Sequence, residues 1–250
     1  AQLFHVRQNV RGSHNQPHSQ WRERRDFAKR DEEMRSGLEN MRAAIFDLDG
    51  TLLDSLHIWE DIDEEFLQKR GLAVPEGYCE AIASMGFLDA ADYAKKRFGF
   101  PESPEAIVAE WNDMAAHRYG NVIQMKPGAR DYLAKLRDRG ILLAVATALP
   151  EKLYRPALRH HGIETWFGAV ASTDETSRGK GYPDVYRLAA KRLGVSPEHC
   201  VVFEDILPGI QGAKAAGMKT MGVYDACSSG IQEDLQRLAD GYIQSFEELL

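Results

Sequence analysis

The sequence predicts an α/β fold, a doubly wound parallel sheet with an all-helical domain inserted into it. Over residues 126–250, short and continuous apolar runs alternate with segments of helical periodicity, which is typical of parallel strands joined by helices. A further apolar run, 43–46, is separated from that region by residues 55–125, where only helical periodicity occurs. With 44% hydrophobic and 28% charged residues, the chain has the composition of a globular protein.

Length and composition limit the classes of function. A chain of 250 residues can form one large domain or a domain with a smaller insertion. The net charge of -7 argues against a general binder of nucleic acid or membrane surfaces, because such proteins need a basic face. The longest apolar run, 141–149, is far shorter than the ~20 residues of a membrane-spanning helix. Three widely spaced cysteines predict neither a disulfide framework nor a zinc site. We therefore expect a soluble protein of the reducing cytoplasm.

The first 40 residues differ from the remainder of the chain. They contain few aliphatic residues, no apolar core of a signal peptide, and acidic residues that transit sequences lack. Residues 21–34 can form a solvated helix, and the scattered histidines are typical of a surface and not of a metal site; they are His5, His14 and His18. We expect residues 1–40 to be a disordered extension without a role in the fold.

The elements follow in order from the first predicted strand at 43–46. The insertion is expected to contain four helices, near 56–70, 75–85, 88–98 and 104–119, the last with Ser103 as its N-cap. From residue 126 the predicted helices are 129–139, 151–161, 183–193 and 209–216, and they alternate with the strands 141–147, 169–172, 200–204 and 220–224. A final strand at 242–244 precedes a terminal helix. The predicted core is therefore 41–54 with 126–250, and the helical domain is 55–125.

Two carboxylates follow the first predicted strand. Asp47 and Asp49 would lie at the carboxyl end of a parallel strand, which is where ligands bind in such sheets. Because they are two residues apart on an extended chain, their side chains can start on one face. Gly50 allows the backbone to bend sharply around whatever the carboxylates hold. This pattern predicts an active site, although an Asp-rich turn with a purely local role is the alternative.

The run Asp47-Leu48-Asp49-Gly50-Thr51 resembles the signature of the haloacid dehalogenase superfamily of aspartate-nucleophile phosphatases. That superfamily has four separated motifs on a Rossmann-like core, and this chain offers a candidate for each in the expected order. The resemblance covers residues 41–250. By the shape of its insertion, the chain is similar to the subgroup of phosphoglycolate phosphatase and β-phosphoglucomutase, in which a helical cap follows the first motif.

The other three motifs are also expected at strand ends. Thr147, with nearby backbone N–H groups such as that of Ala148, can donate hydrogen bonds to a phosphoryl oxygen. Lys180 lies between two glycines shortly before a helix and can extend beside a phosphate as a point charge, with Arg178 as a rival for that role. The adjacent acids Glu204 and Asp205 would repel Asp47 unless a cation offsets their charge. Taken singly, a strand threonine, a solvated loop lysine and a helix-capping aspartate are the structural alternatives.

The resemblance implies a mechanism. Asp47 would attack phosphorus and form an aspartyl-phosphate, while Asp49 would protonate the leaving group and then activate water. Thr147 and Lys180 would stabilise charge on the transferred group. Oxygen ligands suit Mg²⁺, and the implied ligands are the carboxylates of Asp47, Asp205 and Glu204 and the backbone carbonyl of Asp49.

Dehalogenation and phosphosugar mutation are the activities of related proteins that compete with phosphate-ester hydrolysis. Asp49 disfavours dehalogenation, because a departing halide needs no proton. In β-phosphoglucomutase a histidine stands twelve positions after the nucleophile, whereas this chain has Trp59 there and His57 two positions away. A phosphatase is therefore preferred to a phosphosugar mutase. A binding or regulatory protein on the same fold is a third hypothesis, although each catalytic position holds a competent residue.

The cap would select the substrate. Candidate contacts are His57 near the hinge and Gly86 in the turn 84–87. The alternative for His57 is a partly exposed helix residue without a role in binding. That turn carries little charge, which favours a small leaving group such as a sugar. The basic run 95–97 can hold a second phosphate, but a solvated helix end explains it as well. The expected partner is a small phosphorylated metabolite, with no nucleic acid or membrane, and the oligomeric state is left open.

Overall fold

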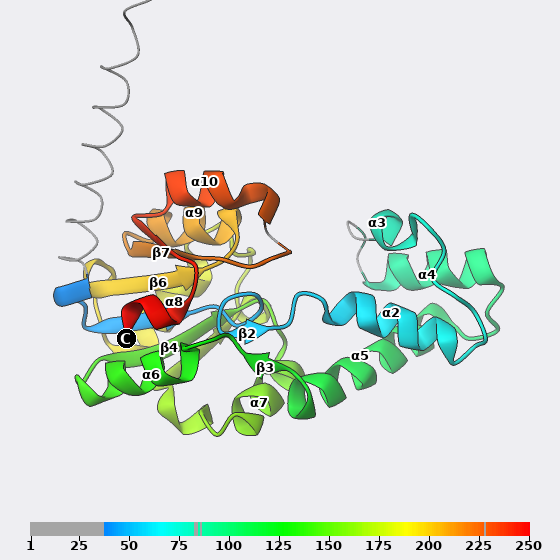
Figure 1. The fold of residues 1–250 in the computed structure, drawn as a ribbon, viewed down its shortest axis with the longest axis horizontal. Helices are drawn as coiled ribbons and strands as arrows, with labels where there is room; N and C mark the ends of the chain where they lie inside the picture. The colour runs from blue at the N-terminus through cyan, green and yellow to red at the C-terminus, as the bar shows by residue number, and fades with distance from the viewer. Residues whose placement is uncertain (1–37, 83–84, 86, 228) are drawn as a thin grey trace, which may run out of the picture.

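The computed structural model describes residues 38–82, 85, 87–227 and 229–250 (Figure 1). The expectations for residues 1–37 of the N-terminal extension, including its helix and histidines, and for Gly86 lie outside the described residues. Of the predicted extension, residues 38–40 are described, and 38–39 are helical. Within the described part of the chain, no helix is long and apolar enough to span a membrane.

A six-stranded sheet in the order β5-β4-β1-β6-β7-β8 forms the centre of the molecule, and every neighbouring pair is parallel. The strands are β1 (Ala43–Phe46), β4 (Leu142–Thr147), β5 (Ala169–Ser172), β6 (Cys200–Glu204), β7 (Lys219–Val223) and β8 (Gly241–Ile243). Strand β1 lies in the middle because it carries only apolar side chains, all of them buried on both faces. The predicted fold class is confirmed.

Alternate side chains of the strands enter two separate hydrophobic cores. Phe46 and Phe203 pack on one face with Tyr132 of helix α6 (Ala129–Asp138), and the two phenylalanine rings are stacked with 4.6 Å between centroids. Ile45 and Val202 belong to the opposite core, with the helices α8 (Asp184–Leu193) and α9 (Leu207–Ala215). Figure 1 shows α9 and α10 (Gln232–Leu238) on one side of the sheet and α6 and α7 (Glu151–His160) on the other. The sheet is therefore doubly wound: successive side chains of a strand point to opposite faces, and helices cover both faces.

Four helices form what we call the helical lobe, residues 58–121, which extends beyond the carboxyl ends of the strands (Figure 1). They are α2 (Ile58–Gln68), α3 (Tyr78–Ile82), α4 (Phe87–Phe98) and α5 (Pro104–Asn121). Ser103 caps α5 as expected, because its side chain accepts a hydrogen bond from the backbone N–H of Ala106. We call the remainder of the described chain the sheet lobe.

The structure differs from the sequence-based expectation in four short elements. Strands β2 (Leu53–Asp54) and β3 (Gln124–Met125) form an antiparallel pair at the base of the helical lobe, where no strand was predicted within residues 55–125. Two residues are too few for an alternating pattern, so only the pairing defines them. Helix α10 was missed because Leu235 is its one buried residue, and the chain ends in the 3-10 helix η5 (Phe246–Leu249) instead of an α-helix.

Candidate active site

Parallel register brings the ends of three strands to one edge of the sheet. Phe46 is paired with both Val145 and Phe203, so the residues that follow these positions emerge side by side. The backbone N–H of Asp47 donates to the carbonyl of Phe203 over 3.1 Å. The side chains collected at this edge are nevertheless buried, and they are Asp47, Thr147, Lys180, Glu204 and Asp205.

Lys180 is the cation at the centre of this group. Its Nζ forms ion pairs with Oδ1 of Asp47 and, over 2.7 Å, with Oε1 of Glu204. The hydroxyl of Tyr186 donates to the same Glu204 oxygen over 2.8 Å. The loop that brings Lys180 here lies against α9 at Gly212, where a Cβ atom would stand 2.0 Å from the Lys180 carbonyl oxygen. A glycine at position 212 is thus required for the position of the lysine.

Three carboxylates surround that single lysine. Asp47, Glu204 and Asp205 each offer an oxygen, and these oxygens lie within 4.8 Å of one another. Oδ1 of Asp205 accepts a hydrogen bond from Thr51, but Oδ2 of Asp205 and Oε2 of Glu204 are buried without a partner. Buried and unpartnered carboxylate oxygens are costly, and an all-oxygen set of this kind suits a hard divalent cation such as Mg²⁺. The residues present therefore fit a metal ion.

Gly50 allows the chain to turn around this cluster. Its φ angle of 75° lies in the left-handed region, and a Cβ atom there would stand 2.3 Å from Oδ2 of Asp205. Both the backbone conformation and the close approach therefore require glycine, as the sequence predicted from the sharp bend.

Burial governs the protonation of the cluster. Loss of hydration raises the pKa values of Asp47, Glu204 and Asp205, that of Glu204 to about 7, while the charge of Lys180 opposes each rise. For Lys180 itself burial favours the neutral form, but the charges of Asp47 and Glu204 outweigh it and raise its pKa. The lysine therefore stays charged, and a divalent cation bound here would compete with protons for the carboxylates.

Asp49 lies outside the lysine network. Its Oδ1 accepts hydrogen bonds from the hydroxyl of Ser55 over 2.6 Å and from the hydroxyl of Tyr119 over 2.7 Å. Burial raises the pKa of Asp49, and the two hydroxyl donors partly offset the rise. The sequence analysis missed Tyr119, which stands 70 residues from Asp49 and near the end of α5, where nothing in the local pattern marks it.

Three further candidates lie in the sheet lobe, namely Thr147, Ala148 and Arg178. Thr147 ends β4, and its Oγ1 accepts a hydrogen bond from the backbone N–H of Leu149 over 3.0 Å. Ala148, between them, is exposed. Arg178, the rival of Lys180, instead pairs with Asp184 over 2.8 Å. Of the two cations, the structure brings Lys180 to the carboxylates.

His57 and the basic run 95–97 are not part of the cluster. His57 is half exposed, with its ring nitrogens 3.9 Å from Asp54 and 3.8 Å from Asp61. The three basic residues at 95–97 all bind partners within the helical lobe, namely the carbonyl of Glu102 for Lys95, Asp92 for Lys96 and the hydroxyl of Tyr93 for Arg97. These pairings favour the structural explanation of the basic run over a second phosphate site.

A cavity of about 490 Å³ opens in the helical lobe, and its walls are mostly apolar. Trp59 and Phe87 line it with their rings 5.1 Å apart, and the buried carboxyl group of Asp63 faces it as well. Leu56 also lines the cavity and reaches Gly50, because a Cβ atom on that glycine would stand 2.9 Å from Cδ1 of Leu56. Leu56 therefore lies between the cavity and the turn at Gly50.

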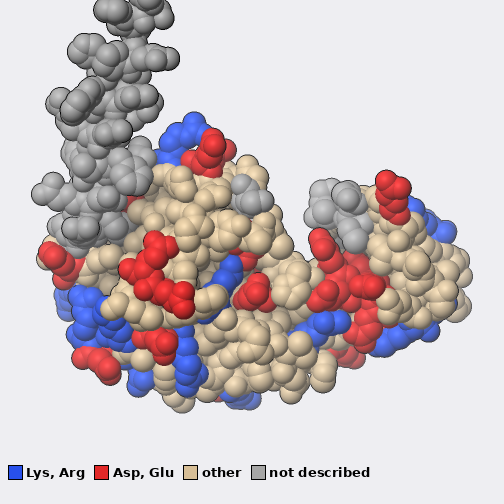
Figure 2. Space-filling view, viewed as in Figure 1, with Lys and Arg blue, Asp and Glu red and all other residues tan. Residues whose placement is uncertain are grey.

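The surface near this region is acidic. Figure 2 shows acidic side chains gathered on the helical lobe beside the hollow that separates it from the sheet lobe. The first turn of α2 contributes Glu60 and Asp61. In the part of the chain that the structure describes, Lys180 is the cation buried at the cluster itself. Lys180 thus provides the positive charge at the strand ends, where three carboxylates surround it.

Comparison with known proteins agrees with this geometry. The family model of the haloacid dehalogenase-like hydrolases matches residues 41–217. The chain is 27% identical over 191 residues to a phosphorylated carbohydrates phosphatase of Thermotoga maritima, covering 76% of this chain and 88% of that protein. It is 29% identical over 185 residues to hexitol phosphatase B of Escherichia coli K12, covering 72% and 82%.

The fold agrees as well. A crystal structure of a CbbY mutant from Rhodobacter sphaeroides, in complex with xylulose-(1,5)bisphosphate, superposes with a TM-score of 0.67 at 27% identity, covering 84% of this chain and 96% of that one. With a family model that matches most of the chain, relatives named phosphatases and a shared fold, this chain belongs to the haloacid dehalogenase-like hydrolases.

Proposed function

We propose that this protein is a Mg²⁺-dependent phosphatase that hydrolyses a small phosphorylated sugar, or a similar metabolite, through an aspartyl-phosphate on Asp47. The observation that supports it most strongly is the buried cluster at the strand ends. There, Asp47 is held by Lys180 beside two unpartnered carboxylate oxygens. A nucleophilic carboxylate, a fixed positive charge and a set of oxygen ligands are the parts that phosphoryl transfer needs.

The chain offers a definite set of ligands to the metal ion. Asp47, Glu204 and Asp205 would hold it, with the backbone carbonyl of Asp49 as a further oxygen. One oxygen of Glu204 is occupied by Lys180 and Tyr186, which leaves Oε2 for the ion. When bound, Mg²⁺ neutralises charge on the phosphoryl oxygens and on the carboxylates.

The reaction of the side chains has two halves. In the first, a carboxylate oxygen of Asp47 attacks phosphorus, the bond to the leaving oxygen breaks, and Asp49 gives that oxygen a proton. In the second, Asp49 takes a proton from water as the water attacks the aspartyl-phosphate, which releases phosphate and restores Asp47. Lys180, the Thr147 hydroxyl and the backbone N–H of Ala148 stabilise charge on the transferred group.

The cavity of the helical lobe suits a sugar. The rings of Trp59 and Phe87 can pack on the apolar face of a sugar, and the Asp63 carboxyl group can accept hydrogen bonds from its hydroxyls. The names of the relatives, a phosphatase of phosphorylated carbohydrates and a hexitol phosphatase, support this class of substrate. We also keep His57 and Gly86 as proposed contacts with the leaving group, and the domain boundaries 55–125 as the proposed cap.

The decisive experiment measures phosphate release from p-nitrophenyl phosphate. We expect release that depends on Mg²⁺, stops with EDTA and returns when Mg²⁺ is restored. Asp47→Asn should lower the rate by at least about a thousandfold because the nucleophile is gone. Asp138→Asn, an exposed carboxylate at the end of α6, is the matched control and should keep the wild-type rate. Equal rates for wild type and Asp47→Asn would reject the proposal.

A product analysis separates the phosphatase from the mutase. The enzyme is incubated with the anomers of glucose 1-phosphate, and free phosphate is measured against glucose 6-phosphate. Because Trp59 stands where the mutase has its histidine, we expect free phosphate. Predominant glucose 6-phosphate would reverse the order of the two hypotheses, and a protein inactive toward every phosphate ester would favour a binding role.

A further inference from the structure

We propose that Tyr119 of the helical lobe is a positioning residue for Asp49, the acid and base of the proposed phosphatase. This inference rests on that proposed function. The Tyr119 hydroxyl donates to Oδ1 of Asp49 over 2.7 Å, and the tyrosine is completely buried. A buried hydroxyl that points at a reacting carboxyl group from another lobe fixes where that group can be.

Both hydroxyl donors use the same oxygen of Asp49. Ser55 donates to Oδ1 over 2.6 Å, as Tyr119 does over 2.7 Å. An oxygen that accepts two hydrogen bonds is the poorer site for the carboxyl proton, so the proton of the acid form resides on Oδ2. The two donors therefore select Oδ2 as the atom that gives the proton to the leaving oxygen and later takes one from water.

The surroundings of Tyr119 favour its role as a donor. Burial raises the pKa of its hydroxyl, and the negative charges of Asp49 and Asp47 raise it further. The raised pKa favours the protonated phenol, which is the form that donates. This property supports the geometric argument, because a hydroxyl that donates keeps Oδ1 in the role of acceptor.

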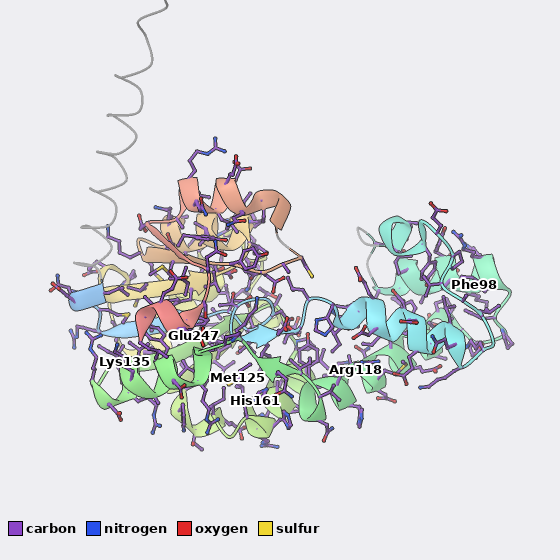
Figure 3. All side chains as sticks on the ribbon, in the orientation of Figure 1. Phe98, Arg118, Met125, Lys135, His161 and Glu247 are labelled. Carbon is purple, nitrogen blue, oxygen red and sulfur yellow. The ribbon has the colours of Figure 1, made fainter. Side chains whose placement is uncertain are left out.

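The position of Tyr119 connects the two lobes. Helix α5 packs against α7 of the sheet lobe, and a Cβ atom on the neighbouring Gly120 would lie 3.4 Å from Cβ of Pro156. Figure 3 shows Arg118 on α5, with Met125 of β3 and His161 beyond α7 labelled on the sheet side. Ser55 reaches Asp49 from the other connection, directly after β2. One donor to the acid therefore comes from the end of α5 in the helical lobe, and the other comes from the connection that follows β2.

The test compares leaving groups. We measure kcat/KM with Mg²⁺ for wild type, Tyr119→Phe and Ser55→Ala on aryl phosphates that range from strongly to weakly acidic phenols, and on an alkyl phosphate. An ester with a poor leaving group needs the proton from Asp49, whereas p-nitrophenyl phosphate hardly needs it. We expect Tyr119→Phe to lose about tenfold on the alkyl phosphate and less than about twofold on p-nitrophenyl phosphate. Ser55→Ala should likewise lower kcat/KM more on the alkyl phosphate than on p-nitrophenyl phosphate.

A matched variant controls for packing. Tyr132→Phe removes a hydroxyl from another buried tyrosine, one that packs among Phe46, Phe203 and Phe246, and it should leave kcat/KM unchanged on every ester. The melting temperature shows whether Tyr119→Phe folds. If it does not, Ser55→Ala gives the answer alone.

The outcomes separate the two proposals. A steeper dependence on the leaving group in Tyr119→Phe supports the inference. An equal loss on every ester assigns Tyr119 a structural role only and overturns the inference, as does no loss on any ester. In both of those cases the wild-type enzyme still hydrolyses the esters, so the phosphatase stands. A wild-type protein without Mg²⁺-dependent activity would refute the phosphatase itself.

Discussion

The two lobes hold their buried acids in different ways. In the sheet lobe, Asp47 and Glu204 share Lys180, and their burial is offset by a matching charge. In the helical lobe, Asp63 is buried beside an apolar cavity, and among the described residues it has no ion pair. Burial, with a smaller contribution from the charge of Glu60, raises the pKa of Asp63 to about 6. The buried acids of the sheet lobe thus have a charged partner, whereas the buried acid of the helical lobe lies beside an apolar cavity.

This difference reflects how each lobe is built. Parallel strands emerge at one edge of a sheet, so residues distant in sequence meet there by topology alone. A helical lobe has no such edge, and the meeting of its side chains depends on how each helix packs against its neighbours. On the proposed function, the residues that react with phosphate lie in the sheet lobe, and the cavity of the helical lobe recognises the leaving group.

The largest expected effect on this difference between the lobes comes from removing Lys180, the cation at the centre of the cluster. Lys180→Met leaves Asp47 and Glu204 without their partner and takes a charge away from the transferred phosphoryl group. We expect kcat/KM on p-nitrophenyl phosphate to fall about a thousandfold. Lys214→Met is the matched control, because Lys214 also pairs with an aspartate, Asp240, over 2.7 Å but far from the cluster. Retention of more than about a tenth of the wild-type rate in Lys180→Met would show that charge at the strand ends is not what matters.

A second test adds one methyl group to each lobe. In Gly212→Ala the new Cβ atom would stand 2.0 Å from the Lys180 carbonyl, so α9 or the lysine loop must move. We expect the free energy of unfolding in urea to fall by about 3 kcal/mol. Gly120→Ala in α5 meets only Cβ of Pro156 at 3.4 Å and should change stability by less than about 1 kcal/mol. Equal free energies of unfolding for the two variants would show that the lysine loop is packed no more tightly than α5 at Gly120.

The smallest test concerns the unpaired acid of the helical lobe. Because the pKa of Asp63 is raised to about 6, the folded protein binds more protons than the unfolded chain between pH ~4 and ~6, and stability falls as pH rises through that window. Asp63→Asn removes this loss. At pH 7 we expect the variant to exceed wild type by about 1–2 kcal/mol in free energy of unfolding, a value reduced for partial screening by solvent.

Urea denaturation of both proteins from pH 4 to pH 7.5 measures this effect. The curves of wild type and Asp63→Asn should converge toward pH 4, where the wild-type carboxyl group is neutral in the folded protein. A constant difference across the range would show that Asp63 is already partnered or hydrated at neutral pH, and that the two lobes treat buried acids alike.

Sequence reasoning was most accurate where a signal is local. Strand β6 and strand β5 begin and end at the predicted residues, because continuous apolar runs are bounded there by polar turns. The Ser103 cap of α5 was recognised from a single side chain next to a proline. Short pairings such as β2 with β3 had no local signal, since two residues become a strand only through their partner.

The chain by itself predicted the alternation of the main strands and helices, the parallel sheet and the acidic residues that follow β1 and end β6, because apolar periodicity and turn residues act over a few neighbouring positions. Only the tertiary structure decided that Lys180 and not Arg178 reaches Asp47, that two oxygens of Glu204 and Asp205 lack partners, and that Tyr119 donates to Asp49. Those facts depend on which side chains of separate elements come within about 3 Å of each other, a distance that the packing of elements sets and that no local pattern records.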